Sequence, residues 1–86
     1  MENNYKIETE DGTWLKIINF PVPENAPVAG ESMWVKVVEG NEYEGVGVLD
    51  NAPVFCEEVE LGDMVRYHNG TDKTKPEYAG LAAPEH

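Results

Sequence analysis

Cysteine is scarce in this chain, and its scarcity excludes several classes of protein. The sequence contains a single cysteine, Cys56, so it has no internal disulfide framework. A nucleophilic thiol needs a nearby base and positive surroundings, and the adjacent Glu57 and Glu58 would oppose its ionisation. His68 has no second His or Cys at the spacing of a metal site. We therefore expect no catalytic residue, no metal site and no cofactor.

Basic residues are also few. Six Lys and Arg stand against 17 Asp and Glu, which gives a formal net charge of −11. Binding to DNA or RNA needs basic side chains that displace counterions from phosphates, and anionic membranes attract basic segments. The composition therefore argues against a direct nucleic-acid or membrane partner. An acidic surface attracts cationic partners instead, although acidity can also serve solubility alone.

Long hydrophobic runs are absent as well. No apolar stretch approaches the roughly 18 residues of a membrane-spanning helix, and no basic-then-apolar start resembles a signal peptide. We therefore expect a cytoplasmic protein, either bacterial or, if phage-encoded, in the host cytoplasm. At 86 residues the chain has room for one small domain.

Helical periodicity is missing too, and the periodic signals that exist alternate with period two, as strands do. Strand-like alternation occurs in six short segments, namely 5–8, 13–18, 33–38, 43–49, 54–59 and 61–68. Turn signals at Asp11-Gly12 and at 39–42 join the first four segments into two hairpins. Segment 20–27 contains three prolines and is expected to be an extended loop.

A flat sheet of this size would leave one face and two edges exposed. We therefore predict an all-β domain, folded as a small, strongly bent sheet or an SH3-like or OB-like barrel of five to six strands. One short helical turn, in 24–32 or in the tail, would make the fold α+β. The single small β domain is placed at residues 1–70. Residues 71–86 lack periodicity and are expected to form an irregular tail whose last residues are mobile.

Two glycines and the apolar face of the strands indicate where the core lies. Gly45 and Gly47 share one face of segment 43–49, a pattern typical of a bend or of close approach by another backbone. The candidate core residues are Ile7, Leu15, Ile17, Met33, Val35, Val37, Val46, Val48, Val59, Leu61 and Val65. If the apolar face of segment 33–38 is the core, Trp34 points outward.

Three motifs occur in order through the middle of the chain. They are Glu31-Ser32-Met33-Trp34-Val35, then Gly47-Val48-Leu49-Asp50-Asn51-Ala52-Pro53, then Leu61-Gly62-Asp63-Met64-Val65. This order resembles domain-of-unknown-function family 2314, whose pattern runs Glu-x-Met-Trp-Val, Gly-x-Leu-x-Asn-x-Pro and Leu-x-x-Gly-Asp-x-Val. The resemblance covers about residues 30–68. It implies a small β-rich domain and brings no established activity with it.

The candidate partner-binding residues are one tryptophan and a neighbouring group of carboxylates, namely Trp34, Glu39, Glu42 and Glu44. An outward tryptophan anchors a partner in one interpretation and covers an open end of a barrel in the other. Asp50 and Asn51 precede Ala52-Pro53. They either define a turn through hydrogen bonds to the backbone or form a ligand-facing loop.

These observations favour a non-catalytic acidic binding domain. It would be an inhibitor or accessory protein that engages a basic protein partner in a phage or bacterial conflict setting. The alternative is a small-molecule or nucleotide-sequestering module, oligomeric, with its site at a protomer boundary. An anionic ligand would require four cations to converge, namely Lys36, Arg66, Lys73 and Lys75. A homo-oligomer built by pairing of edge strands is a further alternative.

Overall fold

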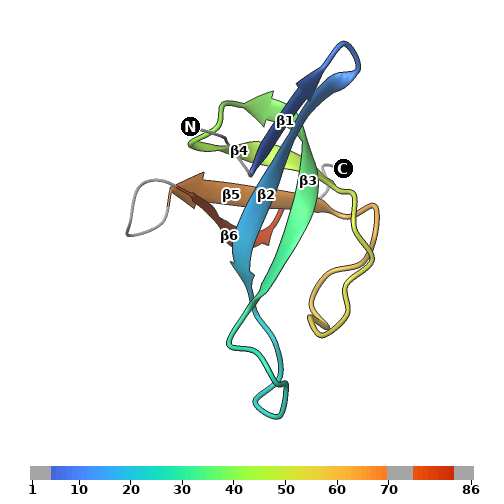
Figure 1. Ribbon diagram of the computed structural model, residues 1–86, viewed down its shortest axis with the longest axis vertical. Helices are drawn as coiled ribbons and strands as arrows, with labels where there is room; N and C mark the ends of the chain where they lie inside the picture. The colour runs from blue at the N-terminus through green and yellow to red at the C-terminus, as the bar shows by residue number, and fades with distance from the viewer. Residues whose placement is uncertain (1–4, 70–74, 83–86) are drawn as a thin grey trace.

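The computed structural model describes residues 5–69 and 75–82, and all regular structure within these ranges is β-strand. The strands are β1 (Lys6–Thr9), β2 (Gly12–Phe20), β3 (Glu31–Gly40), β4 (Glu44–Leu49), β5 (Met64–Asn69) and β6 (Pro76–Leu81). β2 to β6 follow one another around a closed barrel, and β1 lies outside it against β2 (Figure 1). The predicted small all-β barrel is confirmed, and the described segment 24–32 contains no helical turn.

Closure of the barrel joins its first and last strands, β2 and β6, in parallel at Ile18 and Glu77. The other neighbouring pairs are antiparallel. In a meander with an odd number of strands, the last strand runs in the same direction as the first, so closure has to be parallel. A bulge between Ile17 and Phe20 places Asn19 at a φ of 65°. β2 still pairs with β3 beyond the bulge, at Phe20 and Glu31. Asparagine tolerates the left-handed conformation better than most residues.

The predicted irregular tail is wrong for residues 76–81, which form β6. This strand pairs antiparallel with β5 and contacts β2 on its other side. Its own sequence favours a strand only weakly, because Pro76 lacks an amide donor and Gly80 has no side chain to pack. Pairing on both edges supplies what local propensity lacks. Positions 71–74 and 83–86 of the predicted tail lie outside the described residues.

The predicted strand 54–59 is also wrong, because this segment is irregular. The carboxylate of Glu31, at the start of β3, accepts hydrogen bonds from the backbone amides of Val54, Phe55 and Cys56 at 2.8, 3.0 and 2.8 Å. Consecutive amides of a strand point in opposite directions, so three that converge on one carboxylate cannot belong to a ladder. The loop between β4 and β5 is therefore folded around a side chain of β3.

The core fills the barrel and consists of Leu15, Ile17, Phe20, Met33, Val35, Leu49, Cys56, Val59, Val65 and Tyr67. Six of the predicted core residues are confirmed, namely Leu15, Ile17, Met33, Val35, Val59 and Val65. The prediction that Ile7 and Leu61 belong to the core is wrong, since their side chains are 47% and 61% exposed. Ile7 is on β1, which lies outside the barrel, and Leu61 lies in the loop before β5. Val37 is partly buried against the core.

The glycines of β4 explain why Val46 and Val48 are only partly buried. Gly45, Gly47 and Leu49 take the inward positions of this strand, so the two valines face outward. A Cβ atom on Gly47 would overlap the carbonyl oxygen of Lys36 on β3. The predicted close approach of another backbone is therefore confirmed at this position.

Within residues 5–69 and 75–82 there is no long apolar helix of the kind that crosses a bilayer.

Candidate functional site

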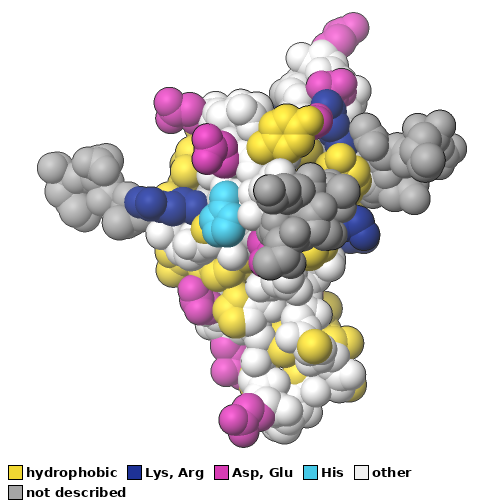
Figure 2. All heavy atoms as spheres, turned by 90° about the vertical axis from the view of Figure 1, so that its left-hand side faces the viewer, with side chains coloured by type: hydrophobic (Ala, Val, Ile, Leu, Met, Phe, Trp, Pro, Cys, Tyr) yellow, Lys and Arg dark blue, Asp and Glu magenta, His cyan; other side chains and the backbone are white. Residues whose placement is uncertain are grey.

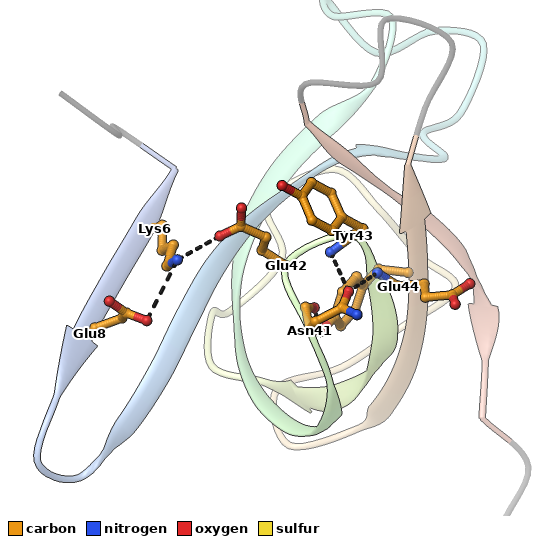
Figure 3. Close-up of polar contacts among 7 residues, drawn as sticks. Lys6, Glu8, Asn41, Glu42, Tyr43 and Glu44 are labelled. Carbon is orange, nitrogen blue, oxygen red and sulfur yellow. Dashed lines mark hydrogen bonds and ion pairs between the residues drawn. The ribbon is translucent and has the colours of Figure 1, made fainter. Parts of the chain in front are cut away.

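The predicted carboxylates lie in and on either side of the turn between β3 and β4, and Asn41 shapes this turn (Figure 3). The Asn41 side-chain oxygen accepts hydrogen bonds from the amides of Tyr43 and Glu44 at 2.7 and 3.0 Å. From inside the barrel, the Tyr67 hydroxyl donates to the Asn41 carbonyl at 2.6 Å. Burial raises the pKa of Tyr67 to about 12, so this hydroxyl keeps its proton and remains a donor. The turn is thereby fixed to the core.

Glu42 is tied to β1. Its carboxylate lies 2.5 Å from the ammonium of Lys6, which also lies 3.5 Å from Glu8. The hydrogen bond from Lys6, together with one from Tyr43, lowers the pKa of Glu42. The same contact with Glu42 raises the pKa of Lys6. Both side chains are about three-quarters shielded from solvent, so Glu42 holds β1 against the turn and is poorly placed to meet a partner.

Glu39 and Glu44, by contrast, are exposed. In Figure 3 the side chain of Glu42 points towards Lys6, whereas that of Glu44 points away from it. The structure thus separates the predicted acidic group into one structural carboxylate and two that face solvent.

These two carboxylates border a broad open groove over the outer face of β4 and β5. Apolar side chains line it, namely Val38, Val46, Met64, Ala79, Leu81 and Ala82. Its acidic side chains are Glu39, Glu44 and Asp63, and Arg66 and His68 also lie along it. Figure 2 shows Asp and Glu side chains beside a histidine on the side of the molecule that holds the β3–β4 turn and the end of β5. We call this surface the β4–β5 groove.

Trp34 lies elsewhere, on the outer face of β2 and β3. There, tryptophans and lysines alternate across the two strands, since Trp14 pairs with Lys36 and Lys16 with Trp34. Each ammonium lies over an indole ring, at 5.2 Å for Lys36 on Trp14 and 5.6 Å for Lys16 on Trp34. The predicted outward direction of Trp34 is confirmed, but the ring is partly buried under Lys16 and is not grouped with Glu39 and Glu44.

Asp50 and Asn51 hold this face in place. The Asp50 carboxylate accepts a hydrogen bond from the Trp14 indole at 2.8 Å, and the Asn51 side chain accepts one from the Trp34 amide at 2.6 Å. Asn51 therefore bonds to the backbone of β3, and Asp50 bonds to a side chain of β2, so neither of these hydrogen bonds lies within the turn itself. Their role as a ligand loop stays a prediction.

The other residues considered for a ligand or metal site lie in different parts of the structure. Lys36 is held over Trp14, and Lys73 lies outside the described residues. Cys56 is buried in the core, and the His68 ring contacts the carbonyl of Asn69. Among residues 5–69 and 75–82, no group of three or more His, Cys, Asp or Glu side chains could hold a metal ion.

Sequence reasoning did not find the apolar lining of the groove. Val38 and Met64 lie on different strands, and Leu81 belongs to β6, where a tail was expected. The available signal was the pair of inward glycines on β4, since they turn Val46 outward.

Comparison with known proteins identifies a family. No curated protein and no solved structure matches the chain. The family model that does match covers residues 1–71, so β6 follows the matched segment. The chain belongs to this family, which is described as "Uncharacterized protein conserved in bacteria (DUF2314)".

Proposed function

We propose that this chain is a non-catalytic binding domain whose β4–β5 groove engages a basic protein partner. The observation that carries the proposal is the combination of exposed apolar side chains and exposed carboxylates on one surface. Apolar contacts supply affinity, and carboxylates at the border select a cationic partner and speed its approach.

The apolar part of the groove is built from side chains of neighbouring strands. Val38 is 57% exposed and Leu81 is 45% exposed, and Met64 lies between their strands on β5. Single exposed apolar residues are ordinary, but a contiguous group bordered by polar side chains is typical of an interaction surface.

The charge of the groove points to a basic partner. Glu39, Glu44 and Asp63 outnumber Arg66, and the whole chain carries a formal net charge of −11. A segment that presents Lys or Arg beside apolar side chains would complement both components of the surface. Glu42 takes no part in the proposed binding because Lys6 neutralises it.

The family description places related proteins in bacteria. We therefore propose, more specifically, an inhibitor or accessory protein, bacterial or phage-encoded, that acts by occupying a basic site on its partner. No catalytic step is required of any residue in it.

The test compares two double charge reversals that change the net charge equally. E39K/E44K alters the groove, whereas E24K/E57K alters exposed carboxylates elsewhere. The probe is a synthetic peptide of alternating lysine and leucine, titrated at low and physiological salt and followed by NMR shifts of the backbone amides. We expect the largest shifts along the groove and about tenfold weaker binding for E39K/E44K. Equal weakening by both double variants, or no weakening by E39K/E44K, would overturn the proposal.

A further inference from the structure

β1 is the strand whose outer edge has no partner among the described residues. The barrel strands are paired on both sides because the barrel closes, whereas β1 pairs with β2 alone. Figure 1 shows it on the outside of β2. An unpaired edge presents backbone donors and acceptors to solvent and is a template for another strand.

The register of β1 determines which backbone groups face outward. Lys16 donates its amide hydrogen to the Tyr5 carbonyl at 2.7 Å, so these facing residues form a hydrogen-bonded pair. Such pairs alternate along an antiparallel ladder. Ile7 and Thr9 therefore direct their backbone groups to β2, and Lys6 and Glu8 direct theirs to the free edge.

We propose that the β1 edge pairs antiparallel with β1 of a second copy of this chain, about a two-fold axis at Ile7. In this register Lys6 faces Glu8 of the second copy, and Ile7 faces Ile7. The outward backbone groups of Lys6 and Glu8 then meet those of the second copy, which is what a hydrogen-bonded pair requires. A one-residue shift would place outward groups opposite inward ones, so the hydrogen bonding selects this register or one displaced by an even number of residues.

The side chains select among the registers that remain. Pairing at Ile7 places a lysine opposite a glutamate on both sides of the axis, and opposite charges on facing residues stabilise a sheet. At the centre, two exposed isoleucines form a non-hydrogen-bonded pair, in which Cα atoms approach to about 4.5 Å and side chains contact closely.

The first experiment substitutes Ile7 with opposite charges. The side chain is 47% exposed, so I7E and I7K should unfold at the temperature of the wild type. By sedimentation equilibrium at physiological salt, we expect the wild-type mass to rise with concentration from 9.6 kDa towards twice that value. I7E and I7K should each stay monomeric, and their mixture should form a heterodimer because Glu then faces Lys. V28E, at a similarly exposed valine in the loop after β2, is the matched control and should associate like the wild type.

A wild type that stays at 9.6 kDa at every concentration, or association by I7E equal to that by V28E, would overturn the proposal. E39K/E44K should dimerise like the wild type, so failure of the groove proposal and failure of the dimer are distinguishable.

The second experiment tests the register by disulfide formation. The native Cys56 is buried, so an added thiol on β1 oxidises without competition from it. In the proposed register, position 7 faces itself at a Cα separation suited to a disulfide, whereas position 8 of one copy lies beyond the roughly 7 Å limit from position 8 of the other. We expect I7C to cross-link under mild oxidation and E8C to remain monomeric. Equal cross-linking of both variants would contradict the register.

Discussion

Glu31 stabilises the fold through backbone amides and without an ion pair to any described residue. Its carboxylate accepts hydrogen bonds from three consecutive residues of the loop between β4 and β5. Burial acts to raise the pKa of Glu31, but the three amide donors outweigh it, so the pKa lies below its ordinary value. The ionised form is therefore the one that holds the loop in place.

This arrangement predicts a pH-dependent loss of stability in E31Q. At pH 7 the substitution should lower the free energy of unfolding by about 1–3 kcal/mol, because hydrogen bonds to a charged acceptor are replaced by contacts with an amide. The folded-state pKa is lowered, so the contribution of Glu31 is complete above the unfolded value near 4.5 and is lost as the pH falls through the folded-state pKa. Urea unfolding from pH 7 to pH 3 should show the two proteins converging.

The control is E57Q, which changes an exposed carboxylate of the same loop. Its free energy of unfolding at pH 7 should equal that of the wild type. If the free energy of unfolding of E31Q is lower than that of the wild type by the same amount at pH 3 and pH 7, the ionised carboxylate is not the stabilising form.

β4 illustrates how one strand fixes the two faces of the barrel. Gly45 and Gly47 remove side chains from its inner face, which lets β3 and the Tyr67 hydroxyl approach its backbone. The same two glycines direct Val46 and Val48 outward, where Val46 lines the β4–β5 groove. The two glycines therefore account both for the close packing of β3 against β4 inside the barrel and for the apolar side chain of β4 in the groove outside it.

Substitution of Gly47 should be far more damaging than substitution of a glycine in open space. In G47A, the new Cβ would overlap the Lys36 carbonyl and a methyl group of Val35, and we expect a loss of about 3 kcal/mol. At Gly62, φ is +94° and no atom lies within 4 Å of the added Cβ, so G62A should lose only the backbone strain of about 1–2 kcal/mol. Chemical denaturation of both variants measures whether G47A is less stable than G62A. A G47A protein as stable as G62A would contradict the close approach of β3 and β4.

The closed barrel depends on a strand that the family match does not reach. The matched segment ends at residue 71, and β6 occupies residues 76–81. β6 covers the edges of both β2 and β5, and the Tyr78 ring stacks on Phe20 with centroids 4.6 Å apart. The Tyr78 hydroxyl donates to Glu58, so β6 also holds the loop before β5.

A chain truncated after Lys75 should therefore fail to fold cooperatively. Loss of β6 would leave β2 and β5 each with an unpaired edge. It would also expose Phe20, which is buried in the core. We expect a broad thermal transition by circular dichroism and binding of a dye that recognises exposed apolar surface. Y78F keeps the ring stack and removes only the bond to Glu58, so it should retain a sharp transition. A sharp transition in the truncated chain would show that residues 1–75 suffice for the domain.

Prediction from sequence succeeded where local pattern decides and failed where distant contacts decide. The hairpins and the inward direction of Leu15 and Val35 follow from alternation, which is a local property. The strand predicted at 54–59 failed because the Glu31 side chain captures its amides from more than twenty residues away. For the candidate site, Glu39 and Glu44 could be named from sequence, but Glu42 could not be separated from them without the position of Lys6.

The sequence by itself determined that this chain is small, acidic and rich in β-strands and that it belongs to a family conserved in bacteria, because composition, alternation and motif order are carried by the chain alone. Only the tertiary structure decided that β6 closes the barrel in parallel with β2, which carboxylates face solvent, and that apolar residues of β3 to β6 line one groove. These features depend on which strands become neighbours. Neighbour pairing is set by the packing of the whole core, and no single segment encodes it.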